Sequence, residues 1–386
     1  MAKKQLQNLS YTTIKLSDNV ASYPSFKVDN SKGYVKCGRD NKFPQFLLEL
    51  NAASSVNSSI IKSKITYSLG AGIDNTSYVG QPNLKEDWNT FLEKIFTDYI
   101  TFGSFSFQVI LNEDDETVSL FHQDYSTIRC GEYDGEGNIN EYYLSNDFTK
   151  NNIKPIVLPT WGSETPKKGT PYIYVYNTYQ PNLPYYSLPD WYGAINYVDA
   201  DGLLSKFYNN AINNNFTPSS IIMMPSDPSP EEKEAFQKSL TGTFSGADNT
   251  NNLLVLWNQS IDNQIKIEKF QASDNADLYN NVNDIIFQKI ITAHRLTSPV
   301  LAGISGSGNL SGNANEIINA YILFNYTVIQ NYRLKVLNVI NQFVRRNYNT
   351  ELAIKELPIV KMIKESETTK DKEDIIEDIN KNLTQK

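Results

Sequence analysis

The stretches whose residue types could do chemistry are a glycine-rich run and a cluster of acids. The run "GISGSGNLSGN", at 303–313, superficially resembles a phosphate-binding loop. A Walker loop needs a lysine whose ammonium group reaches the phosphates, and this run has none, so backbone flexibility is the favoured interpretation. The acids of "LNEDDETVSL", at 111–120, could bind a divalent cation through carboxylate oxygens. They stand between two strand patterns, however, where a solvated hairpin tip is the ordinary explanation.

Histidine and cysteine are scarce. The chain has two histidines, His122 and His294, and two cysteines, Cys37 and Cys130. These four residues are scattered over four segments, which is not the spacing of a zinc site, so we expect no metal and no cofactor. Two cysteines make no disulfide framework, so we expect both to be buried in a protein synthesised in a reducing cytoplasm. His294 stands at the end of an expected helix, where the helix dipole favours a cation, so we expect capping there and not catalysis.

The charge and composition of the chain argue against several classes of protein. Its 386 residues carry a formal net charge of -8, which argues against nucleic-acid binding over the whole surface. The 24 tyrosines and 18 phenylalanines predict a folded chain with an aromatic core. The N-terminus lacks the apolar run of a signal peptide, and no stretch has 18 uncharged apolar residues. We therefore expect neither export by a signal peptide nor a membrane-spanning helix.

Helices precede strands in the first half of the chain. Apolar residues at helical spacing predict two consecutive helices that begin near Pro44 and end at the turn of Gly70. They predict another helix over 84–101, with Leu84 on its apolar face. Five alternating runs then predict short strands, namely "SFSFQVIL", "VSLFHQ", "TIRCGEY", "NINEYYL" and "YIYVYN". The first half is therefore expected to be α+β.

Two long helical patterns bracket a small insert in the second half. The segments 187–215 and 276–296 each read as one helix. Between them, "SSIIMMP", "NLLVLW" and "QIKIEKF" predict strands, and Ser229 with Glu232 predicts a capping box at a helix start. Beyond the glycine-rich run, 313–347 keeps helical periodicity without proline or glycine. At about 1.5 Å per residue this is about 50 Å of helix, which must span an assembly or kink within it.

This order of parts resembles the portal proteins of tailed double-stranded DNA bacteriophages, especially the compact portals of the long-tailed phage family. The resemblance runs from about 34 to 347 and rests on "KFPQFLLEL", on the insert "NNNFTPSSIIMMPSDPSPEEKEAFQKSLTGTFSGADNTNNLLVLW" and on "DIIFQKIITAHRLTSPVLAGISGSGNLSGNANEIINAYILF". The strands are unusually rich in tyrosine and asparagine, and no long acidic tail follows. The resemblance implies an α+β subunit of a portal ring.

The resemblance also implies a division of the chain into named parts. The expected parts are an N-terminal arm (1–33), an α+β wing (34–186), a first stem helix (187–215), an α/β clip (216–272), a second stem helix (273–298), a tunnel loop (299–315), a tunnel helix with wing return (316–349) and a short helical crown or C-terminal tail (350–386).

A portal of this kind implies a ring, usually of twelve copies, at one capsid vertex of the virion, assembled in the cytoplasm of the host bacterium. The ring conducts double-stranded DNA during packaging and ejection. The implied partners are further copies of the chain, DNA bound without sequence specificity, the terminase large subunit, the major capsid protein and a head-tail adaptor. The chain itself is then expected to be a structural protein and not an enzyme, and no membrane is involved.

In this interpretation the neutral run becomes the tunnel loop around the DNA. No charged side chain lies within 303–315, so the loop touches phosphates without the counterion release that would hold DNA in place. The expected channel residues are Gly303, Ser305, Gly306, Ser307, Gly308, Asn309, Leu310 and Ser311. The expected cationic contacts to DNA on the tunnel helix are Arg333, Lys335, Arg345 and Arg346. For the last two, dipole compensation at the helix end is an equal alternative, and for the loop the alternative is a surface linker.

The clip is expected to bind the packaging motor and later the head-completion proteins through the exposed edges of its short strands. The expected partner-binding residues are Ser229, Glu232, Lys238, Trp257 and Lys266. A second hypothesis remains from a different class, an enzyme of nucleic-acid or sugar metabolism that depends on a divalent cation bound by the acids around 112–116.

Overall fold

The computed structural model describes most of the segments expected to form the wing, the stem and the tunnel helix, and parts of the segment expected to form the clip. These names are kept below for the residue ranges given above. The described residues are 26–29, 32–74, 78–114, 116–148, 150, 154–213, 220–224, 229, 231–232, 235, 254–257, 266–269, 276–304 and 314–358. The N-terminal arm before residue 26, the channel residues 305–313 and the tail after 358 lie outside them.

The two leading helices are confirmed. Helix α1 (Phe43–Ala53) has a proline in its first turn, and α2 (Ser55–Leu69) begins where the hydroxyl of Ser54 accepts a 3.1 Å hydrogen bond from the amide of Asn57. This bond satisfies one of the amides that a helix start leaves without a partner. Helix α2 ends at Gly70, as the sequence predicts.

Helix α3 (Trp88–Phe102) starts later than the sequence pattern indicates. The side chain of Asp87 accepts a hydrogen bond of 2.8 Å from the amide of Thr90 and so caps the helix. Leu84, which we expected on the apolar face, lies before this cap and is fully exposed. The prediction was wrong there because the capping carboxylate, and not the apolar spacing, sets the first residue of the helix.

The wing is built on two small antiparallel sheets. The first has the order β4-β3-β8 and contains β3 (Ser104–Leu111), β4 (Val118–Gln123) and β8 (Pro171–Asn177). The second has the order β5-β6-β7 and contains β5 (Ile128–Cys130), β6 (Glu141–Leu144) and β7 (Ile156–Pro159), with the short helix η1 (Tyr125–Thr127) before it. A hairpin of β1 (Lys27–Asp29) and β2 (Tyr34–Lys36) precedes them. The five predicted strands are confirmed; β1, β2 and β7 were not predicted.

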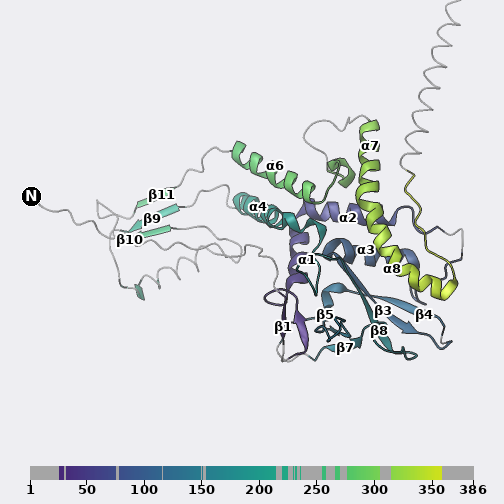
Figure 1. Cartoon of the computed structure of the whole chain (residues 1–386). Helices are drawn as coiled ribbons and strands as arrows, with labels where there is room; N and C mark the ends of the chain where they lie inside the picture. The colour runs from purple at the N-terminus through teal and green to yellow at the C-terminus, as the bar shows by residue number, and fades with distance from the viewer. Residues whose placement is uncertain are drawn as a thin grey trace, which may run out of the picture.

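Aromatic side chains fill the core between the first sheet and the helices. Figure 1 shows α3 and α8 running beside strands β3, β4 and β8. Phe107 of β3 lies edge-on to Phe91 of α3, with ring centroids 6.0 Å apart, and edge-on to Phe343, at 5.3 Å. Such pairs add to the stabilisation that burial of the rings supplies. The prediction of an aromatic core is confirmed.

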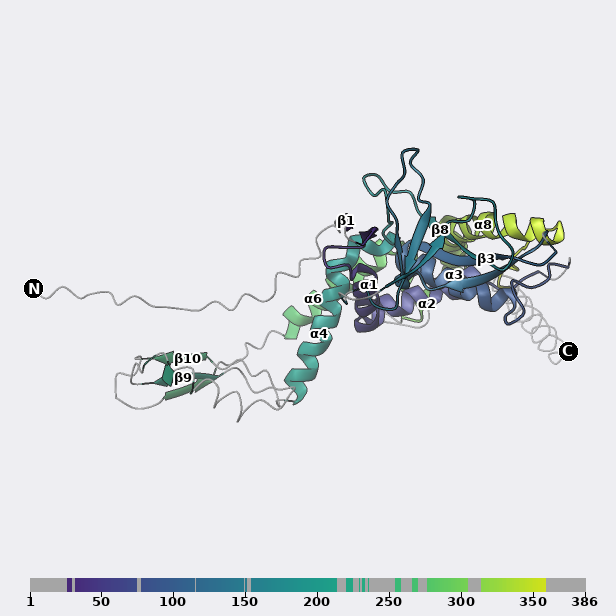
Figure 2. The ribbon, with the colours of Figure 1, turned by 90° about the horizontal axis from the view of Figure 1, so that it is seen from below.

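The stem consists of two helices that lie side by side. The short helix η2 (Asp190–Ala194) leads into α4 (Ile195–Asn213), and α6 (Ala276–Ala293) returns along it. The expected single helix over 187–215 is therefore a 3-10 turn followed by an α-helix. Figure 2 shows a small sheet beyond the ends of these helices. It has the order β10-β9-β11, with β10 (Leu254–Trp257) parallel and β11 (Lys266–Lys269) antiparallel to β9 (Ser220–Met224).

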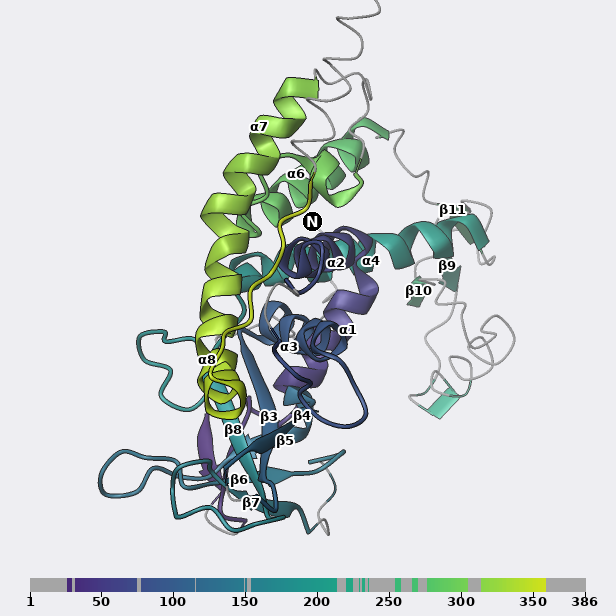
Figure 3. The same cartoon turned by 90° about the vertical axis from the view of Figure 1, so that its right-hand side faces the viewer.

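The tunnel helix is present but changes its hydrogen-bond pattern once. After η3 (Pro299–Ala302), the chain enters α7 (Ala314–Phe324), passes through the π-helical segment η4 (Asn325–Ile329) and continues as α8 (Gln330–Tyr348). Figure 3 shows α7 and α8 following one another along one side of the molecule. A π-helical turn inserts one extra residue and is a common site of bending in long helices. None of the helices in the described part of the chain is both long and apolar enough to cross a membrane.

Candidate functional site

Both ends of the predicted tunnel loop are held against the body of the protein. The hydroxyl of Tyr67 donates to the carbonyl of Leu301 at 2.8 Å, and that of Ser59 donates to Ala302 at 2.6 Å, so two side chains of α2 hold η3. On the other side, the hydroxyl of Thr297 donates to the carbonyl of Ala320 in α7, at 2.7 Å. The base of the loop is therefore fixed by side chains of α2 and of the turn that follows α6.

Of the eight predicted channel residues, the structure describes one. Gly303 is exposed, ends η3 and has a φ of +69°, the left-handed conformation that glycine adopts at little cost. The other seven lie outside the described residues, namely Ser305, Gly306, Ser307, Gly308, Asn309, Leu310 and Ser311. Their role as channel residues stays a prediction.

An ionic cluster around the buried lysine Lys64 joins α2, η2, the turn after α6 and α8. The Nζ atom of Lys64 on α2 is 3.3 Å from Oδ2 of Asp190 in η2 and 3.1 Å from the hydroxyl of Tyr332 on α8. The same Oδ2 atom also accepts hydrogen bonds from the Tyr332 hydroxyl and, at 3.3 Å, from the guanidinium of Arg295. The side chain of Lys64 is wholly buried, whereas that of Asp190 keeps 28% of its surface exposed. One carboxylate oxygen of η2 thus joins α2, α8 and the turn after α6.

The environment of this cluster shifts the pKa values of its members. Burial lowers the pKa of Lys64, although Asp190 opposes the shift. Burial by itself would raise the pKa of Asp190, but the charge of Lys64 and the hydrogen bond from Tyr332 hold this pKa below its ordinary value. Burial and the adjacent carboxylate raise the pKa of Tyr332 well above its ordinary value. The phenol is therefore a hydrogen-bond donor at neutral pH.

His294 does not cap a helix as a cation, so that prediction was wrong. Its side chain is completely buried, stacks on Trp191 with centroids 6.1 Å apart, and its Nε2 atom lies 2.8 Å from Oδ1 of Asn57. Burial lowers the pKa of His294 well below its ordinary value, and the nearby positive charge of Lys64 lowers it further. The imidazole is neutral because the helix dipole is too weak to offset this desolvation.

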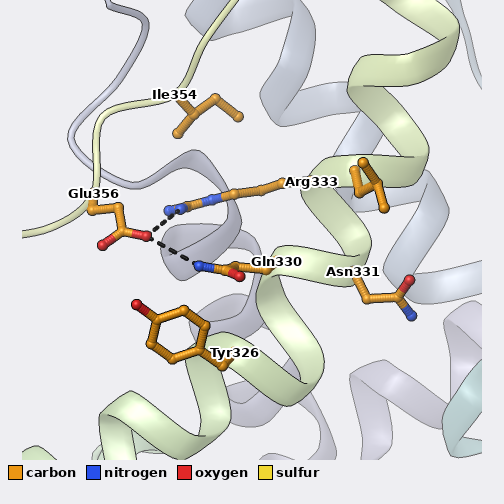
Figure 4. Close-up of a pocket in the computed structure, with 7 residues that line it drawn as sticks. Tyr326, Gln330, Asn331, Arg333, Ile354 and Glu356 are labelled. Carbon is orange, nitrogen blue, oxygen red and sulfur yellow. Dashed lines mark hydrogen bonds and ion pairs between the residues drawn. The ribbon is translucent and has the colours of Figure 1, made fainter.

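Arg333, one of the predicted DNA contacts, is buried and binds the end of α2. Its side chain is buried, and its Nε and NH2 atoms donate to the carbonyls of Ser68 and Tyr67, at 2.9 and 2.7 Å. These carbonyls belong to the last turn of α2, where backbone acceptors lack partners within the helix. Figure 4 shows the guanidinium directed toward Glu356, whose carboxylate lies 4.0 Å away. The helical spacing placed Arg333 correctly on α8 but could not show which face α2 covers.

Arg333 lines the groove drawn in Figure 4. The groove has a volume of about 500 Å³ and lies between α8 and the segment after it. Glu356 accepts hydrogen bonds from the side chains of Gln330, at 3.3 Å, and Asn325, at 3.4 Å. The residues that line the groove are Tyr326, Gln330, Asn331, Arg333, Leu334, Ile354 and Glu356.

The other three predicted DNA contacts point in different directions. Lys335 is half-buried and lines a cleft of about 70 Å³ beside Arg295. Arg345 is exposed and pairs with Glu351 at 3.5 Å. Arg346 donates to the carbonyl of Glu116 at 2.8 Å and lies over the ring of Trp161. Each of the four cations thus has surroundings of its own, and their contact with DNA stays a prediction.

The clip residues are partly described. The predicted capping box is confirmed, because the amide of Ser229 donates to Oε2 of Glu232 at 2.9 Å and the amide of Glu232 to the hydroxyl of Ser229 at 3.3 Å. Trp257 lies on β10 opposite Met224, and Lys266 lies on β11. Lys238 lies outside the described residues. Binding of a partner by these residues stays a prediction.

The acidic hairpin forms the turn that the sequence suggests. Asp114 accepts hydrogen bonds from the amides of Glu116 and Thr117, at 3.0 and 2.9 Å, between strands β3 and β4. This is the local bonding by which aspartate stabilises turns. In the described part of the chain, no three metal-binding side chains of His, Cys, Asp or Glu gather at one point. Nothing here favours the hypothesis of a cation-dependent enzyme.

Cys37 and Cys130 are buried as expected, and burial raises the pKa of each thiol to about 12.

Known structures resemble this chain in overall fold. A chain in the neck of an empty gene transfer agent particle, computed with C6 symmetry, is 13% identical, with a TM-score of 0.55 over 83% of this chain and 86% of that one. A chain in the neck of the native particle, computed with C12 symmetry, is 13% identical, with a TM-score of 0.52 over 85% and 89%. This chain has the fold of that neck protein.

The other comparisons establish neither a common fold nor a family. An HK97-family phage portal protein from Corynebacterium diphtheriae is 9% identical over 84% of this chain and 96% of that one, but its TM-score of 0.39 is too low to establish a common fold. No protein-family model matches the sequence, and no curated protein matches it either.

Sequence reasoning missed the ionic cluster. Lys64 follows Ile60 and Ile61 by four and three residues, so it lies on the buried face of α2. A lysine on an apolar helical face was the signal that could have found it, since buried lysines are rare without an acidic partner. Asp190 and Tyr332 carried no comparable signal, because both are ordinary residues at a helix start and on a helix face.

Proposed function

We propose that this protein is a portal subunit of a tailed phage or a phage-like particle. Twelve copies form a ring at one capsid vertex, and double-stranded DNA passes through the ring during packaging and ejection. The observation that carries the proposal is the fold shared with a neck protein of gene transfer agent particles over 83% of this chain. The order of wing, stem, clip, loop and long helix agrees with it independently.

Apolar side chains exposed on the stem and tunnel helices support assembly into a ring. Folded monomers seldom leave several large apolar groups exposed on neighbouring helices unless that surface binds something. The large apolar residues exposed on α4, α6, α7, η4 and α8 in the described part of the chain are Leu203, Phe207, Tyr208, Val282, Ile285, Leu323, Tyr326 and Leu334. A head-to-tail ring needs two different contact surfaces on each subunit, and the stem and the tunnel helix supply two such surfaces.

In this ring the loop at 303–315 narrows the channel around the duplex. Because the loop has no charged side chain, it does not bind the phosphates through counterion release, and the DNA can slide past. Hydrogen bonds from Tyr67, Ser59 and Thr297 fix the base of the loop and so hold the neutral residues in place relative to the subunit. No bond chemistry takes place in this chain, and a separate packaging ATPase supplies the energy of translocation.

The clip is the docking site for that ATPase, the terminase large subunit, and afterwards for a head-tail adaptor. Short strands at the edges of a three-stranded sheet offer free backbone groups to a partner, and β10 and β11 are the edges here. The wing contacts the major capsid protein. The ring is built in the host cytoplasm and becomes part of the virion.

The native mass in solution, measured with negative-stain images, tests the proposal. A ring close to twelve times 43.8 kDa with an open centre is the expected result. Deletion of 219–269 should leave the circular-dichroism spectrum of the wing intact and abolish terminase capture. A monomer or dimer under all conditions contradicts the ring, and unchanged terminase capture contradicts the role of the clip.

A further inference from the structure

The ionic cluster of Lys64, Asp190, Tyr332 and Arg295 lies at an informative place in the chain. Arg295 belongs to the turn that follows α6 and leads into η3 on the N-terminal side of the tunnel loop. Tyr332 lies in the first turn of α8, beyond α7 and η4 on the C-terminal side of the loop. Both donate to the same atom, Oδ2 of Asp190. The two arms of the loop therefore converge on one carboxylate.

This arrangement is a costly way to stabilise a fold. Lys64 has no exposed surface, and its ammonium contacts the Asp190 carboxylate at 3.3 Å and the Tyr332 hydroxyl at 3.1 Å. An apolar side chain at a buried position commonly stabilises a protein as well as a buried ion pair does, because an ion pair loses its hydration. An ion cluster can in addition specify how the helices pack, because its hydrogen bonds form in one register of the helices and are lost in the others.

The π-helical segment η4 lies between the cluster and helix α7 of the second arm. Segment η4 ends at Ile329, three residues before Tyr332, and α7 lies on its far side. A π-helical turn has a weaker hydrogen-bond pattern than the α-helix around it, so bending concentrates there. A displacement of α7 is thus absorbed at η4, whereas α8 stays tied to Asp190.

We propose that Asp190 is the positioning residue of the tunnel loop, and that it holds both arms of the loop, through Arg295 and Tyr332, in one register against the buried ammonium of Lys64. Loss of this carboxylate releases the two arms together and leaves the rest of the wing in place. The inference rests on the proposed function in one respect, because only in a ring does the loop have a channel to narrow. The anchoring by Asp190 is a property of the folded subunit.

Hydrogen exchange measured by mass spectrometry on the full chain tests this inference. In Asp190→Asn, amides of 296–304 and 314–332 should exchange about tenfold faster or more, because the charge-assisted hydrogen bonds that join the arms are lost. Amides of α3 and β3 should keep their wild-type rates. Unchanged rates in the two arms, or an equal increase in α3 and β3, would overturn the proposal.

A matched control is available in the wing. Asp98 is a carboxylate more deeply buried than Asp190, and its Oδ2 atom lies 2.9 Å from Nε2 of His122 and 3.0 Å from the amide of Tyr125, so these hydrogen bonds reach neither arm. In Asp98→Asn the exchange of the arms should stay as in wild type. If this variant accelerates the arms as much as Asp190→Asn does, the anchoring role is refuted.

Two further variants separate positioning from stability. Tyr332→Phe removes one hydroxyl and should accelerate exchange in 314–332 even if Asp190→Asn does not fold; no acceleration contradicts the proposal. The pair Lys64→Met with Asp190→Asn removes the buried charge, so the unfolding midpoint should recover while both arms still exchange fast. Recovery of slow exchange in the arms would show that only stability was involved. Native mass is recorded on the same samples, so absence of a wild-type ring counts against the proposed function and not against the anchor.

Discussion

His294 and Asn57 form a buried hydrogen bond across 237 residues of sequence, with Nε2 of the histidine 2.8 Å from Oδ1 of the asparagine. Asn57 lies in the first turn of α2, and His294 follows the last turn of α6. The bond therefore joins the second stem helix to the wing. Because the imidazole is buried and neutral, it also makes the stability of this junction depend on pH.

We predict that the protein loses stability as the pH falls below about 6.5. The pKa of His294 in the folded chain lies well below its ordinary value of 6.5. Below that value the unfolded chain binds a proton that the folded chain does not, so the free energy of unfolding should fall by up to about 1.4 kcal/mol per pH unit. Urea unfolding at pH 7.5, 6.5, 5.5 and 5.0 measures this dependence. His294→Gln should flatten the curve; an identical slope in that variant means that another group is responsible.

We predict that Arg333 contributes to folding. In Arg333→Met the carbonyls of Ser68 and Tyr67 lose a charged donor, which should lower the free energy of unfolding by about 2 kcal/mol. Arg345 is the control, since it is exposed and makes a single ion pair at 3.5 Å; Arg345→Gln should cost about 0.5 kcal/mol or less. Chemical denaturation of both variants gives the comparison. Equal losses would show that the buried hydrogen bonds of Arg333 contribute no more to the free energy of unfolding than the exposed ion pair of Arg345.

We predict that Gly70 tolerates no side chain. Its φ is +59°, and an added Cβ atom would lie 2.2 Å from the carbonyl oxygen of Lys355 and 2.6 Å from NH2 of Arg333. Gly137 also has a left-handed backbone, with φ +86°, but an added Cβ atom would meet nothing within 4 Å. Gly137→Ala should therefore cost about 1 kcal/mol for the backbone conformation alone, and Gly70→Ala about 2 kcal/mol more. Thermal unfolding of the two variants measures the difference, and similar losses would rule out the steric effect.

We predict that the neutral loop is dispensable for ring assembly but needed to retain DNA. Shortening 305–312 removes Leu310 as its one large apolar side chain, so little association energy is lost. Rings of normal mass should form, whereas the particles should fail late in packaging or leak DNA. Native mass and DNA content of purified particles are the measurements. Stable, full particles would make the loop an idle linker, and absence of rings would make it an assembly element.

Added charge in the loop should act differently from shortening. Ser307→Lys with Asn309→Lys would place about 24 cations around the duplex in a twelvefold ring, and each neutralised phosphate makes DNA release depend more strongly on salt. Packaging should slow at low salt and recover in part at higher salt. The matched control is Ser307→Gln with Asn309→Gln, which adds length without charge and should package at the wild-type rate. A salt response equal to that of this control would contradict the charge argument.

Local patterns in the sequence were enough to predict the elements and their order. The spacing of apolar residues predicts α1, α2 and the tunnel helix, and alternation predicts β3 and β4 with the bounds that the structure has. Ser229 and Glu232 predict a capping box because its two hydrogen bonds join residues three apart. Such features depend on neighbours in sequence, so no tertiary information is needed to see them.

Only the tertiary structure decided which polar residues are buried and what they bind. Lys64 and Tyr332 meet across 268 residues, and Arg333 reaches Ser68 across 265. Whether a charged side chain on a helix faces solvent or a neighbouring helix depends on how the helices pack, and one sequence pattern is compatible with several packings. The four cations of the tunnel helix were therefore grouped by sequence as one set, whereas packing gives each its own surroundings. The same packing brings both arms of the loop to Asp190, because residues this far apart acquire a common partner only when the wing, stem and tunnel helices are assembled.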